Sequence, residues 1–488
     1  MTDPIEHRQI AIIGAGFGGI GLAIKLREAG FGDLVVMERA DDLGGTWQAN
    51  TYPGCACDVP SHLYSYSFAP NPGWSRTYGR QPEILEYIRS VAVKHGVDRD
   101  IRYNCEVLEA RWDEQEALWR LDTAGGPLTA DFLLSATGVF AEAKYPVLPG
   151  LENFEGTTFH SLHWDHDYDL AGKNVAVIGT GASAVQFIPE IQPKVVFLTV
   201  FQRSAPWIMP RLDRRTSSAT QRLLRSVPLV GKAIRGAWYV AIEGFGSVGF
   251  IDNRFRHPYE AIGKLQLRRQ VRDPQLRRKL TPDYMIGCKR AIFADAYLPA
   301  LGRPNVDVVT DGIAEVRARS IVTRAGVEIP VDAIIYGTGF EPLAAAYDRI
   351  IGSEGVSVGE VMRKQRQSYL GAALAGFPNF FLTLGPFGAA GNQSAIFMIE
   401  SQITYIVEAL RRVRAVGAGR IEVRREAQDA FVAEMERRSA DTVWLTGGCQ
   451  SYYTTPDGHN SGLYPNWSFE YRRRTATFDH ASYEVSHL

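Results

Sequence analysis

Short, nearly unbroken apolar runs recur along the chain, and two of them pass directly into a glycine-rich turn and an apolar helical segment. The first is "IAIIGAGFGGIGLAIKLREAG", beginning at Ile10, and the second is "KNVAVIGTGASAVQFIPEI", beginning at Lys173. A strand, a tight turn and a helix in this order are typical of a unit that binds a dinucleotide. The pattern therefore predicts an α/β protein with two Rossmann-like dinucleotide-binding domains.

The order of the elements also predicts how the two domains share the chain. Two further apolar runs, residues 132–140 and 331–340, contain threonine and glycine near their ends, which permits a tight turn at the nucleotide-binding edge of a sheet. We expect the chain to return to the first domain after completing the second. The expected division is a first domain (1–145 plus 330–488), a second domain (146–211 plus 285–329) and a helical insertion (212–284).

Gly14, Gly16 and Gly19 form the G-x-G-x-x-G pattern of the first turn. The first glycine permits the turn, the second lets a pyrophosphate approach the backbone, and the third lets the helix pack close to the strand. Unpaired N–H groups at the start of the helix can then bind phosphate. The next strand, "DLVVMER", leads to Glu38, nineteen residues after Gly19, where a carboxylate can accept hydrogen bonds from a ribose diol.

Gly179, Gly181 and Ala184 hold the three small-residue positions of the second turn. Nineteen residues after Ala184 stands Arg203 instead of an acid. A guanidinium at that point suits a 2′-phosphate, and the neighbouring Ser204 can add a hydrogen bond. We therefore expect the second nucleotide to be NADP rather than NAD. The alternative is that Arg203 is a surface arginine at the end of a strand.

Composition and charge exclude some classes of partner. The chain has 488 residues with 53 basic and 54 acidic side chains, and its formal net charge of -1 argues against a nucleic-acid-binding protein. Arginine clusters at residues 211–225 and 268–279 are most simply solvated helix faces, with peripheral membrane contact as the less favoured alternative. We read no signal peptide in the first residues, and the five scattered cysteines fit a reducing cytoplasm.

The segment after the first acid carries further candidate residues. Gly45 permits a close backbone approach to the first dinucleotide, and Trp47 could flank a bound ring or fill the core. Asp58 is an acid among small and apolar residues, so we expect it to pair with a cation. Far along the chain, "MIGCKR" ends in Lys289 and Arg290. One of these two cations could bind the 2′-phosphate, and the other could lie at the first cofactor and pair with Asp58. The alternative is a solvated pair of cations.

Between the two turns lies "FEGTTFHSLHWD", which runs from Phe154 to Asp165. It holds two histidines, a tryptophan and an acid, although a tether between two domains needs only to be soluble. The simple alternative is a packed connecting segment whose polar groups are satisfied locally.

With these residues in place, the chain resembles the type I Baeyer–Villiger monooxygenases, and among them the subgroup similar to 4-hydroxyacetophenone monooxygenase. The stretch fits that family's signature F-x-G-x-x-x-H-x-x-x-W-[P/D] at Phe154, Gly156, His160, Trp164 and Asp165. The resemblance covers nearly the whole chain and includes "GGTW", "YPG", "GCKR" and "GFPNFF". It implies that the stretch links the two domains and couples their motion to the catalytic cycle, with His160 as a hinge residue and not a proton donor.

The resemblance implies an FAD- and NADPH-dependent monooxygenase that inserts one oxygen atom of dioxygen next to a ketone carbonyl, by way of a peroxyflavin, to give an ester or lactone. Arg290 would stabilise the developing negative charge, and Asp58 would hold the guanidinium in place. We expect a small-molecule ketone and dioxygen as partners, a monomer or homodimer, and no metal. The residues predicted to bind the cofactors are Gly14, Gly16, Gly19, Glu38, Gly45, Thr46, Trp47, Asp58, Tyr64, Val107, Gly179, Thr180, Gly181, Ser183, Ala184, Arg203, Ser204, Lys289 and Tyr452.

The chain departs from the family at one position, and other classes remain as alternatives. In "GCQSYY", Tyr452 stands where the family often has tryptophan, in a loop that closes over the nicotinamide cofactor. A flavin monooxygenase that oxidises sulfur or nitrogen, or hydroxylates, usually has a variant signature and no arginine equivalent to Arg290. A disulfide reductase is disfavoured by the C-x-C spacing of Cys55 and Cys57. A non-enzymatic flavin-binding protein would need neither Arg203 nor the cations of "GCKR".

Overall fold

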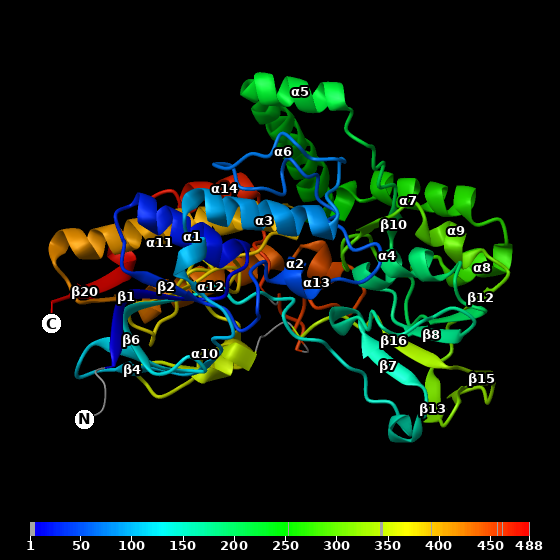
Figure 1. Cartoon of the computed structure of the whole chain (residues 1–488). Helices are drawn as coiled ribbons and strands as arrows, with labels where there is room; N and C mark the ends of the chain where they lie inside the picture. Colours follow the sequence, from blue (N-terminus) through cyan, green and yellow to red (C-terminus); the bar gives the residue numbers. More distant parts are fainter. Residues whose placement is uncertain are drawn as a thin grey trace.

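The computed structural model describes residues 5–251, 253–341, 345–391, 393–455, 457–460 and 462–487. Two sheets with parallel strands lie side by side, each with helices packed on it, and a helical segment projects above them (Figure 1). Each of the two glycine-rich turns connects a central strand of one sheet to a helix on its face. The predicted α/β architecture with two Rossmann-like units is confirmed.

The first sheet is built around β1, the strand that leads into the first turn. Its order is β17-β4-β5-β6-β1-β2-β3, and β18 also pairs with β6. The strands β6, β1, β2 and β3 run parallel, whereas β4 and β5 form an antiparallel extension. The bounds are β1 Glu6–Ile13, β2 Leu34–Met37, β3 Ile101–Arg102, β4 Val107–Asp113, β5 Leu118–Thr123, β6 Leu128–Ser135, β17 Ile350–Ile351 and β18 Phe380–Leu382.

The second half of β1 is buried on both faces, which explains its continuous apolar sequence. Ile10 and Ile12 join the core beneath α1, α3 and α11, whereas Ala11 and Ile13 join a second core on the opposite face, next to α10 (Figure 1). The sheet is therefore sandwiched between two apolar layers, and its carboxyl edge is left for the turn. The helices are α1 Phe17–Glu28, α3 Gln81–His95, α10 Val358–Gln365 and α11 Ala395–Val416.

The second sheet is parallel throughout and has the order β12-β9-β8-β16-β7. Helices α4 and α9 pack on one face, and the small antiparallel sheet β13-β14-β15 packs on the other. Because β16 pairs with β8, the predicted return to the first domain at residue 330 is one strand too early; the rest of the expected division stays a prediction. The bounds are β7 Thr157–His160, β8 Asn174–Ile178, β9 Phe197–Phe201, β12 Val306–Val309, β13 Ile313–Arg317, β14 Ser320–Thr323, β15 Glu328–Pro330, β16 Ala333–Tyr336, α4 Ala182–Ile191 and α9 Tyr297–Leu301.

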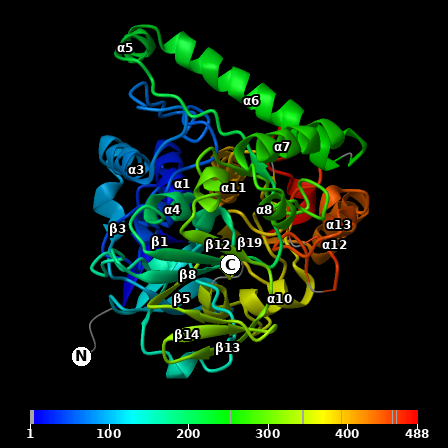
Figure 2. The same ribbon diagram turned by 90° about the vertical axis from the view of Figure 1, so that its right-hand side faces the viewer.

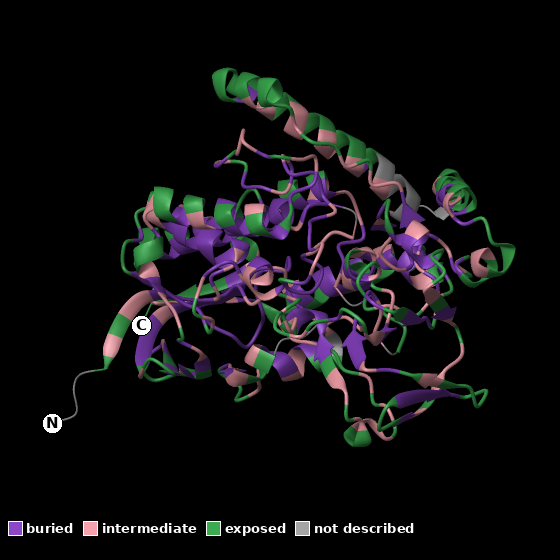
Figure 3. Cartoon of the chain, turned by 45° about the vertical axis from the view of Figure 1, so that its right-hand side comes forward, coloured by how far each residue is buried: buried purple, intermediate pink, exposed green. Residues whose placement is uncertain are grey.

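The segment expected as a helical insertion forms an arm on the second unit. The short strands β10 and β11 pair in parallel at its base, and α5 lies at its outer end (Figure 2). Helix α6 also contacts the first unit, because the Nη1 of Arg235 donates to the carbonyl oxygens of His62 and Ser65, both at 2.9 Å. Most of the outer surface of α5 and the start of α6 is exposed (Figure 3). Across the described part of the chain, no helix has both the length and the apolar character needed to cross a membrane. The bounds are β10 Ile208–Met209, α5 Ser218–Ser226, α6 Pro228–Ile251, α7 His257–Gln270, α8 Pro274–Lys279 and β11 Ile292–Phe293.

The C-terminal elements return to the first unit, where Asn379 ties three segments together. Its Nδ2 donates to the carbonyl oxygens of Asp131 and Gly419, both at 2.9 Å, and its Oδ1 accepts from the N–H of Ile421 at 2.8 Å. The side chain is fully buried, and its φ of +52° is one that asparagine tolerates better than most residues. The remaining elements are α2 Thr46–Ala49, α12 Arg425–Ser439, α13 Val443–Thr446, α14 Ser468–Arg474, β19 Arg420–Val423 and β20 Tyr483–Ser486.

We predict that Asn379→Ala lowers the free energy of unfolding by about 3 kcal/mol, because it leaves one buried and two partly buried backbone groups without their partners. Asn104 is a matched control, since it has the same φ of +52° but an exposed side chain. Asn104→Ala should cost only about 1 kcal/mol, the usual penalty of a left-handed conformation. Urea unfolding followed by tryptophan fluorescence measures both values, and equal losses would mean that the hydrogen bonds of Asn379 contribute little.

Candidate active site

The first glycine-rich turn forms an open cradle at the start of α1. Gly14 has a φ of +97°, which side chains rarely adopt. A Cβ on Gly19 would lie 1.8 Å from the carbonyl oxygen of Gly14, so α1 can pack this close to the turn only with glycine there. Gly16 begins α1 without a side-chain cap, and the first turn of the helix has no acid. The N–H groups of the turn therefore suit an anionic pyrophosphate.

Glu38 lies at the carboxyl end of β2, beside this cradle. Its buried carboxylate accepts hydrogen bonds from the N–H of Ala15 at 2.8 Å and of Ala40 at 2.9 Å. Each carboxylate oxygen retains acceptor capacity, so Glu38 could also bind a ribose diol. Val107 is the first residue of β4 and lies near Glu38. Two residues before it, the N–H of Cys105 donates to the carbonyl oxygen of Glu38 at 2.8 Å.

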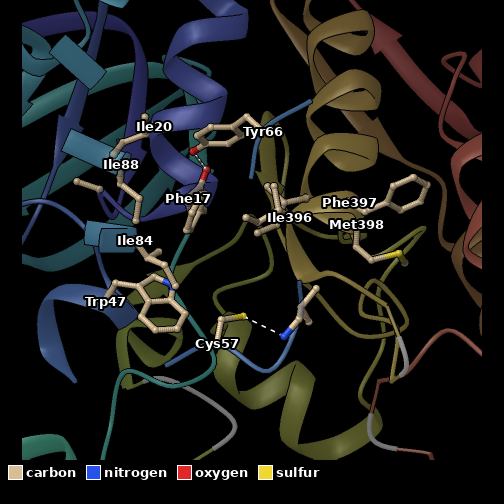
Figure 4. Packing of buried hydrophobic residues seen from close by; sticks show 14 of the residues in the cluster. Phe17, Ile20, Trp47, Cys57, Tyr66, Ile84, Ile88, Ile396, Phe397 and Met398 are labelled. Atoms are coloured by element: carbon tan, nitrogen blue, oxygen red, sulfur yellow. Dashed lines mark hydrogen bonds between the residues drawn. The ribbon is translucent and has the colours of Figure 1, made fainter. Parts of the chain in front are cut away.

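The segment that follows forms an aromatic wall near the cradle. A Cβ on Gly45 would lie 3.1 Å from the Cα of Gly16, so the two backbones are nearly in contact. Thr46 begins α2, and the indole N–H of Trp47 donates to the Oη of Tyr64 at 3.1 Å. Only 7% of Trp47 is exposed, and Figure 4 shows it packed within the apolar core of the first unit. Trp47 thus fills the core and positions Tyr64.

The second glycine-rich turn repeats the plan at the start of α4. A Cβ on Gly179, whose φ is +105°, would lie 2.4 Å from the carbonyl oxygen of Gly337. Gly181 precedes α4 without a side-chain cap, and no acid lies in the first turn of the helix, which contains Ser183 and the buried Ala184. This turn, too, suits a pyrophosphate.

Two cations lie beyond the second turn, as the sequence predicts. The Nζ of Lys289 donates to the Oγ of Ser204 at 2.6 Å, and the carbonyl oxygen of Ser204 accepts from the Oγ1 of Thr180 at 3.3 Å. Burial lowers the pKa of Lys289, and the nearby charge of Arg203 lowers it further. Arg203 is exposed just after β9. Two positive charges that repel each other would both gain from an anion between them, which fits a 2′-phosphate.

Arg290 and Asp58 form the predicted ion pair across 232 residues of chain. Nε of Arg290 donates to Oδ2 at 2.9 Å and Nη2 donates to Oδ1 at 2.6 Å, a two-point geometry that fixes the guanidinium plane. Burial opposes ionisation of Asp58, but the charge of Arg290 outweighs it and holds the pKa of the carboxyl below its usual range. Asp58 in turn raises the pKa of Arg290. The side chain of Arg290 remains 34% exposed, which leaves part of it able to contact a ligand.

The loop that carries Tyr452 lies against this ion pair. The Oη of Tyr452 donates to the Oη of Tyr453 at 3.1 Å, and both phenols lie close enough to Arg290 to interact with it electrostatically. A disulfide between Cys288 and Cys449 joins this loop to the "GCKR" segment. The number and spacing of the cysteines did not predict this disulfide. Its presence weakens the argument that the protein occupies a reducing compartment.

The stretch from Phe154 to Asp165 is more than a tether, because its centre is an edge strand of the second sheet. Residues 157–160 form β7, which pairs with β16. The ring of Trp164 packs against Phe187 of α4 at a centroid distance of 5.3 Å. Asp165 closes a turn by accepting from the N–H groups at residues 167 and 168, both at 3.1 Å. Asp165 and the Nδ1 of His160 are thus satisfied locally, as the simple alternative expected, whereas the buried Oγ of Ser161 has no hydrogen-bond partner among the described residues.

His160 is fully buried at the end of β7, next to the second threonine-glycine turn. Its Nδ1 accepts from the N–H of Leu162 at 3.0 Å, and its ring lies 5.4 Å from Tyr145 and 5.9 Å from Phe340 between centroids. Burial lowers the pKa of His160 to about 4, although a hydrogen bond with the backbone of Gly339 favours a higher pKa. The imidazole is thus neutral at neutral pH, which fits a structural residue better than a proton donor.

Cys55 and Cys57 are both buried and unpaired. Burial raises the pKa of Cys55 to about 12 and raises that of Cys57 further above its usual range. The sulfur of Cys57 accepts from the N–H of Val59 at 3.3 Å within the core (Figure 4). Both thiols are therefore protonated and poorly reactive, which agrees with the unfavourable C-x-C spacing.

Sequence reasoning missed contacts that join the two units. The Oη of Tyr52 donates to the Oε1 of Gln186 at 3.0 Å, and the same oxygen accepts from the N–H of Ala56 at 3.2 Å. Arg211 places a second cation near Asp58, and its Nη2 donates to the carbonyl oxygen of Cys57 at 2.8 Å. The "YPG" motif was a usable signal for Tyr52, whereas Gln186 belongs to no recognised pattern. The expectation that Arg211 lies on a solvated helix face is wrong, because it precedes α5 and donates to the backbone of Cys57.

Comparisons with known proteins match this arrangement. A family model described as pyridine nucleotide-disulphide oxidoreductase matches residues 11–227, which include both glycine-rich turns. A protein of Streptomyces coelicolor named Baeyer-Villiger monooxygenase is 45% identical, with 98% of this chain and 93% of that protein covered. A Pseudomonas aeruginosa protein of the same name is 43% identical, with 99% and 92% covered. A solved structure of oxidised steroid monooxygenase bound to NADP has a TM-score of 0.87 and 29% identity, over 99% of this chain and 100% of that one. The chain belongs to the Baeyer–Villiger monooxygenases.

Proposed function

We propose that this protein is an FAD- and NADPH-dependent monooxygenase that converts a ketone to an ester or lactone. The overall reaction consumes one ketone, dioxygen, NADPH and a proton, and yields the ester, NADP⁺ and water. The observation that carries the proposal is the Arg290–Asp58 ion pair, which holds a partly exposed guanidinium between the two nucleotide units. The membership of the family supports the reaction class.

The first cradle would hold FAD. Its glycine turn and uncapped helix suit the pyrophosphate, and Glu38 suits the ribose. When bound, FAD supplies the transfer of electrons from NADPH to dioxygen. Trp47 and Tyr64 would form a rigid wall next to it, because their hydrogen bond and edge-to-face packing restrict both rings.

The second cradle would hold NADPH. Its pyrophosphate would bind the start of α4, and Arg203, Ser204 and Lys289 would bind the 2′-phosphate. Burial and the like charge of Arg203 make protonated Lys289 less favourable in the free protein, and a bound phosphate would relieve that repulsion.

Arg290 would be the catalytic residue for oxygen insertion. Negative charge develops on the ketone oxygen and on the transferred oxygen, and a fixed guanidinium stabilises such charge without reorganisation. Asp58 would act as a positioning residue, since its two hydrogen bonds hold the guanidinium plane. His160, which is neutral and enclosed, would serve as a hinge residue at the end of β7, the edge strand of the second sheet. The identity of the ketone, a cytoplasmic location and a monomeric or homodimeric state stay predictions.

We predict a preference for NADPH over NADH of about thirty- to a thousand-fold in kcat/KM, because Arg203 and Lys289 would each make a charge-assisted bond worth about 1–2 kcal/mol. Arg203→Ala should lower kcat/KM for NADPH about tenfold and leave the value for NADH nearly unchanged. Arg303→Ala, a change at an exposed arginine of the same unit, is the control. Equal efficiency with both coenzymes in the parent protein would contradict the assignment.

We predict that Arg290→Ala lowers ester formation about a hundred- to a thousand-fold, the usual cost of removing one preorganised group from a charge-stabilising site. NADPH oxidation should continue, with hydrogen peroxide as the product in place of the ester. Asp58→Ala should have a smaller effect in the same direction.

The measurement is simultaneous recording of NADPH loss, peroxide release and ester formation. Arg211→Ala is the matched control, because it removes a neighbouring cation that does not bond to Asp58 through a two-point contact. Ester formation by Arg290→Ala at the parent rate would show that the proposed role is wrong. An equal loss of ester formation in Arg211→Ala would indicate that the overall positive potential of the site, and not the position of Arg290, supports the reaction.

We predict that the double substitution Cys55→Ser and Cys57→Ser leaves NADPH-driven ester formation unchanged within measurement error. The thiols are buried and protonated, and a serine hydroxyl can still accept from the N–H of Val59. Steady-state rates and flavin absorbance of the purified variant are the measurements. Loss of turnover with flavin still bound would favour the disulfide-reductase alternative.

A further inference from the structure

The disulfide between Cys288 and Cys449 joins two segments that are 161 residues apart. Cys288 is fully buried and lies two residues before Arg290, in the "GCKR" segment. Cys449 is partly exposed and lies in the loop of residues 447–453, which we call the tyrosine loop. The cross-link therefore connects the segment that carries the two cations with the loop that lies against them.

The contact between these segments is close even without the covalent bond. A Cβ on Gly447 would lie 2.5 Å from the Cβ of Cys288, and the carbonyl oxygen of Gly447 accepts from the N–H of Met285 at 3.0 Å. At the other end of the loop, Tyr453 is buried and packs against Trp444 at a centroid distance of 6.4 Å. The two sulfur atoms are thus held together by the packing of both ends of the tyrosine loop.

The middle of the loop is less constrained. Gly448 and Gln450 are exposed, and Gly448 has a φ of +76°. Cys449 lies between them, so the disulfide is the covalent restraint on this exposed part of the loop. The loop brings the phenols of Tyr452 and Tyr453 to Arg290. A restraint on Cys449 therefore acts on the position of groups beside the ion pair.

We propose that Cys288 and Cys449 form a reversible redox site that sets the order of the tyrosine loop over the cation segment. Hydrogen peroxide is the oxidant. The partly exposed thiolate of Cys449 attacks peroxide, the O–O bond breaks, and a sulfenic acid forms with release of hydroxide. Cys288 then attacks that sulfur, the S–O bond breaks and water is formed after proton transfer. The sum is two thiols plus peroxide giving one disulfide plus two waters, and a dithiol reductant reverses it.

The source of the oxidant rests on the proposed function. A monooxygenase that consumes NADPH and dioxygen without inserting oxygen releases hydrogen peroxide beside this pair. The other three cysteines are buried and unpaired, and burial raises the pKa of Cys55 and Cys57, so they are poor competitors for peroxide. Oxidation should therefore be selective for Cys288 and Cys449.

The cross-link should favour the arrangement of the loop described above, because it removes conformational freedom from all others. Reduction should lower the population of this arrangement. If that population falls to about a tenth to a third, the apparent affinity for NADPH falls about three- to tenfold. Peroxide release per NADPH should rise at the same time, since a looser loop leaves the ion pair more exposed to water.

The first test maps the cross-link without using activity. The full-length protein is treated with a dithiol reductant, then with hydrogen peroxide, and alkylated and digested under non-reducing conditions at each stage. The Cys288–Cys449 peptide should disappear on reduction and return with peroxide, while Cys55, Cys57 and Cys105 remain alkylatable after denaturation. Failure of the peptide to return, or equal oxidation of the other cysteines, would overturn the proposal. Cycling of the cross-link in a protein that makes no ester would instead reject the proposed function and leave this site in place.

The second test measures the effect on the loop and the coenzyme. Hydrogen exchange in residues 447–453 and the KM for NADPH should both rise when the disulfide is reduced. Cys449→Ser should behave like the reduced protein under either condition, and it avoids a change at the buried Cys288. Cys105→Ser, at a buried thiol between β3 and β4, is the matched control and should retain the redox response. Identical exchange and KM in the oxidised and reduced parent would show that the disulfide has no regulatory effect.

Discussion

The ion pair between Arg290 and Asp58 is the interaction on which the site depends. Removing one partner of a partly buried pair leaves a charge without compensation, which is far more costly than losing a surface salt bridge. The pair therefore requires that the segment after the first nucleotide turn and the "GCKR" segment meet in one geometry. Lys289 and Cys288 lie on the same short segment as Arg290. The contact of Lys289 with Ser204 and that of Cys288 with Cys449 therefore depend on the same placement of this segment.

The parts of the site that follow from local chemistry could be predicted from the sequence. The turn at Gly14 and Gly19 needs glycine for a conformation and a close approach that the neighbouring residues alone define. Arg203 ends a strand at a fixed spacing from its turn, so its place in the fold follows from the βαβ unit. For the Asp58–Arg290 pair, the sequence itself indicates only that an acid in an apolar segment requires a cation, and the resemblance to the family identifies Arg290 as that cation.

The features of the fold and the site that depend on contacts between segments far apart in the sequence could not be predicted in the same way. The strand at residues 333–336 resembles the strand before the first threonine-glycine turn, and only its pairing with β8 assigns it to the second sheet. The Tyr52–Gln186 contact joins a loop to a helix across the two units and has no periodic signal. The disulfide joins two cysteines that are 161 residues apart, and the connectivity of such a pair depends on the tertiary structure alone. The segment between the two turns likewise could have been a simple tether, and only the pairing of β7 with β16 shows that it belongs to the second sheet.

Tyr452 and Tyr453 lie beside the ion pair, and Tyr452 stands where the family often has tryptophan. Their chemistry decides how much this exchange alters the site. Tyr452 is the donor in its bond to the hydroxyl of Tyr453, a role that an indole N–H can also take, whereas only the phenol oxygen can accept a further hydrogen bond. Burial raises the pKa of Tyr452 well above its usual range, and Arg290 only partly offsets this effect. The phenol therefore stays neutral at neutral pH and does not compete with Asp58 as an anion. The guanidinium keeps a single anionic partner in its two-point contact, so the exchange of tryptophan for tyrosine changes the surface of the loop while leaving the charge state of the ion pair intact.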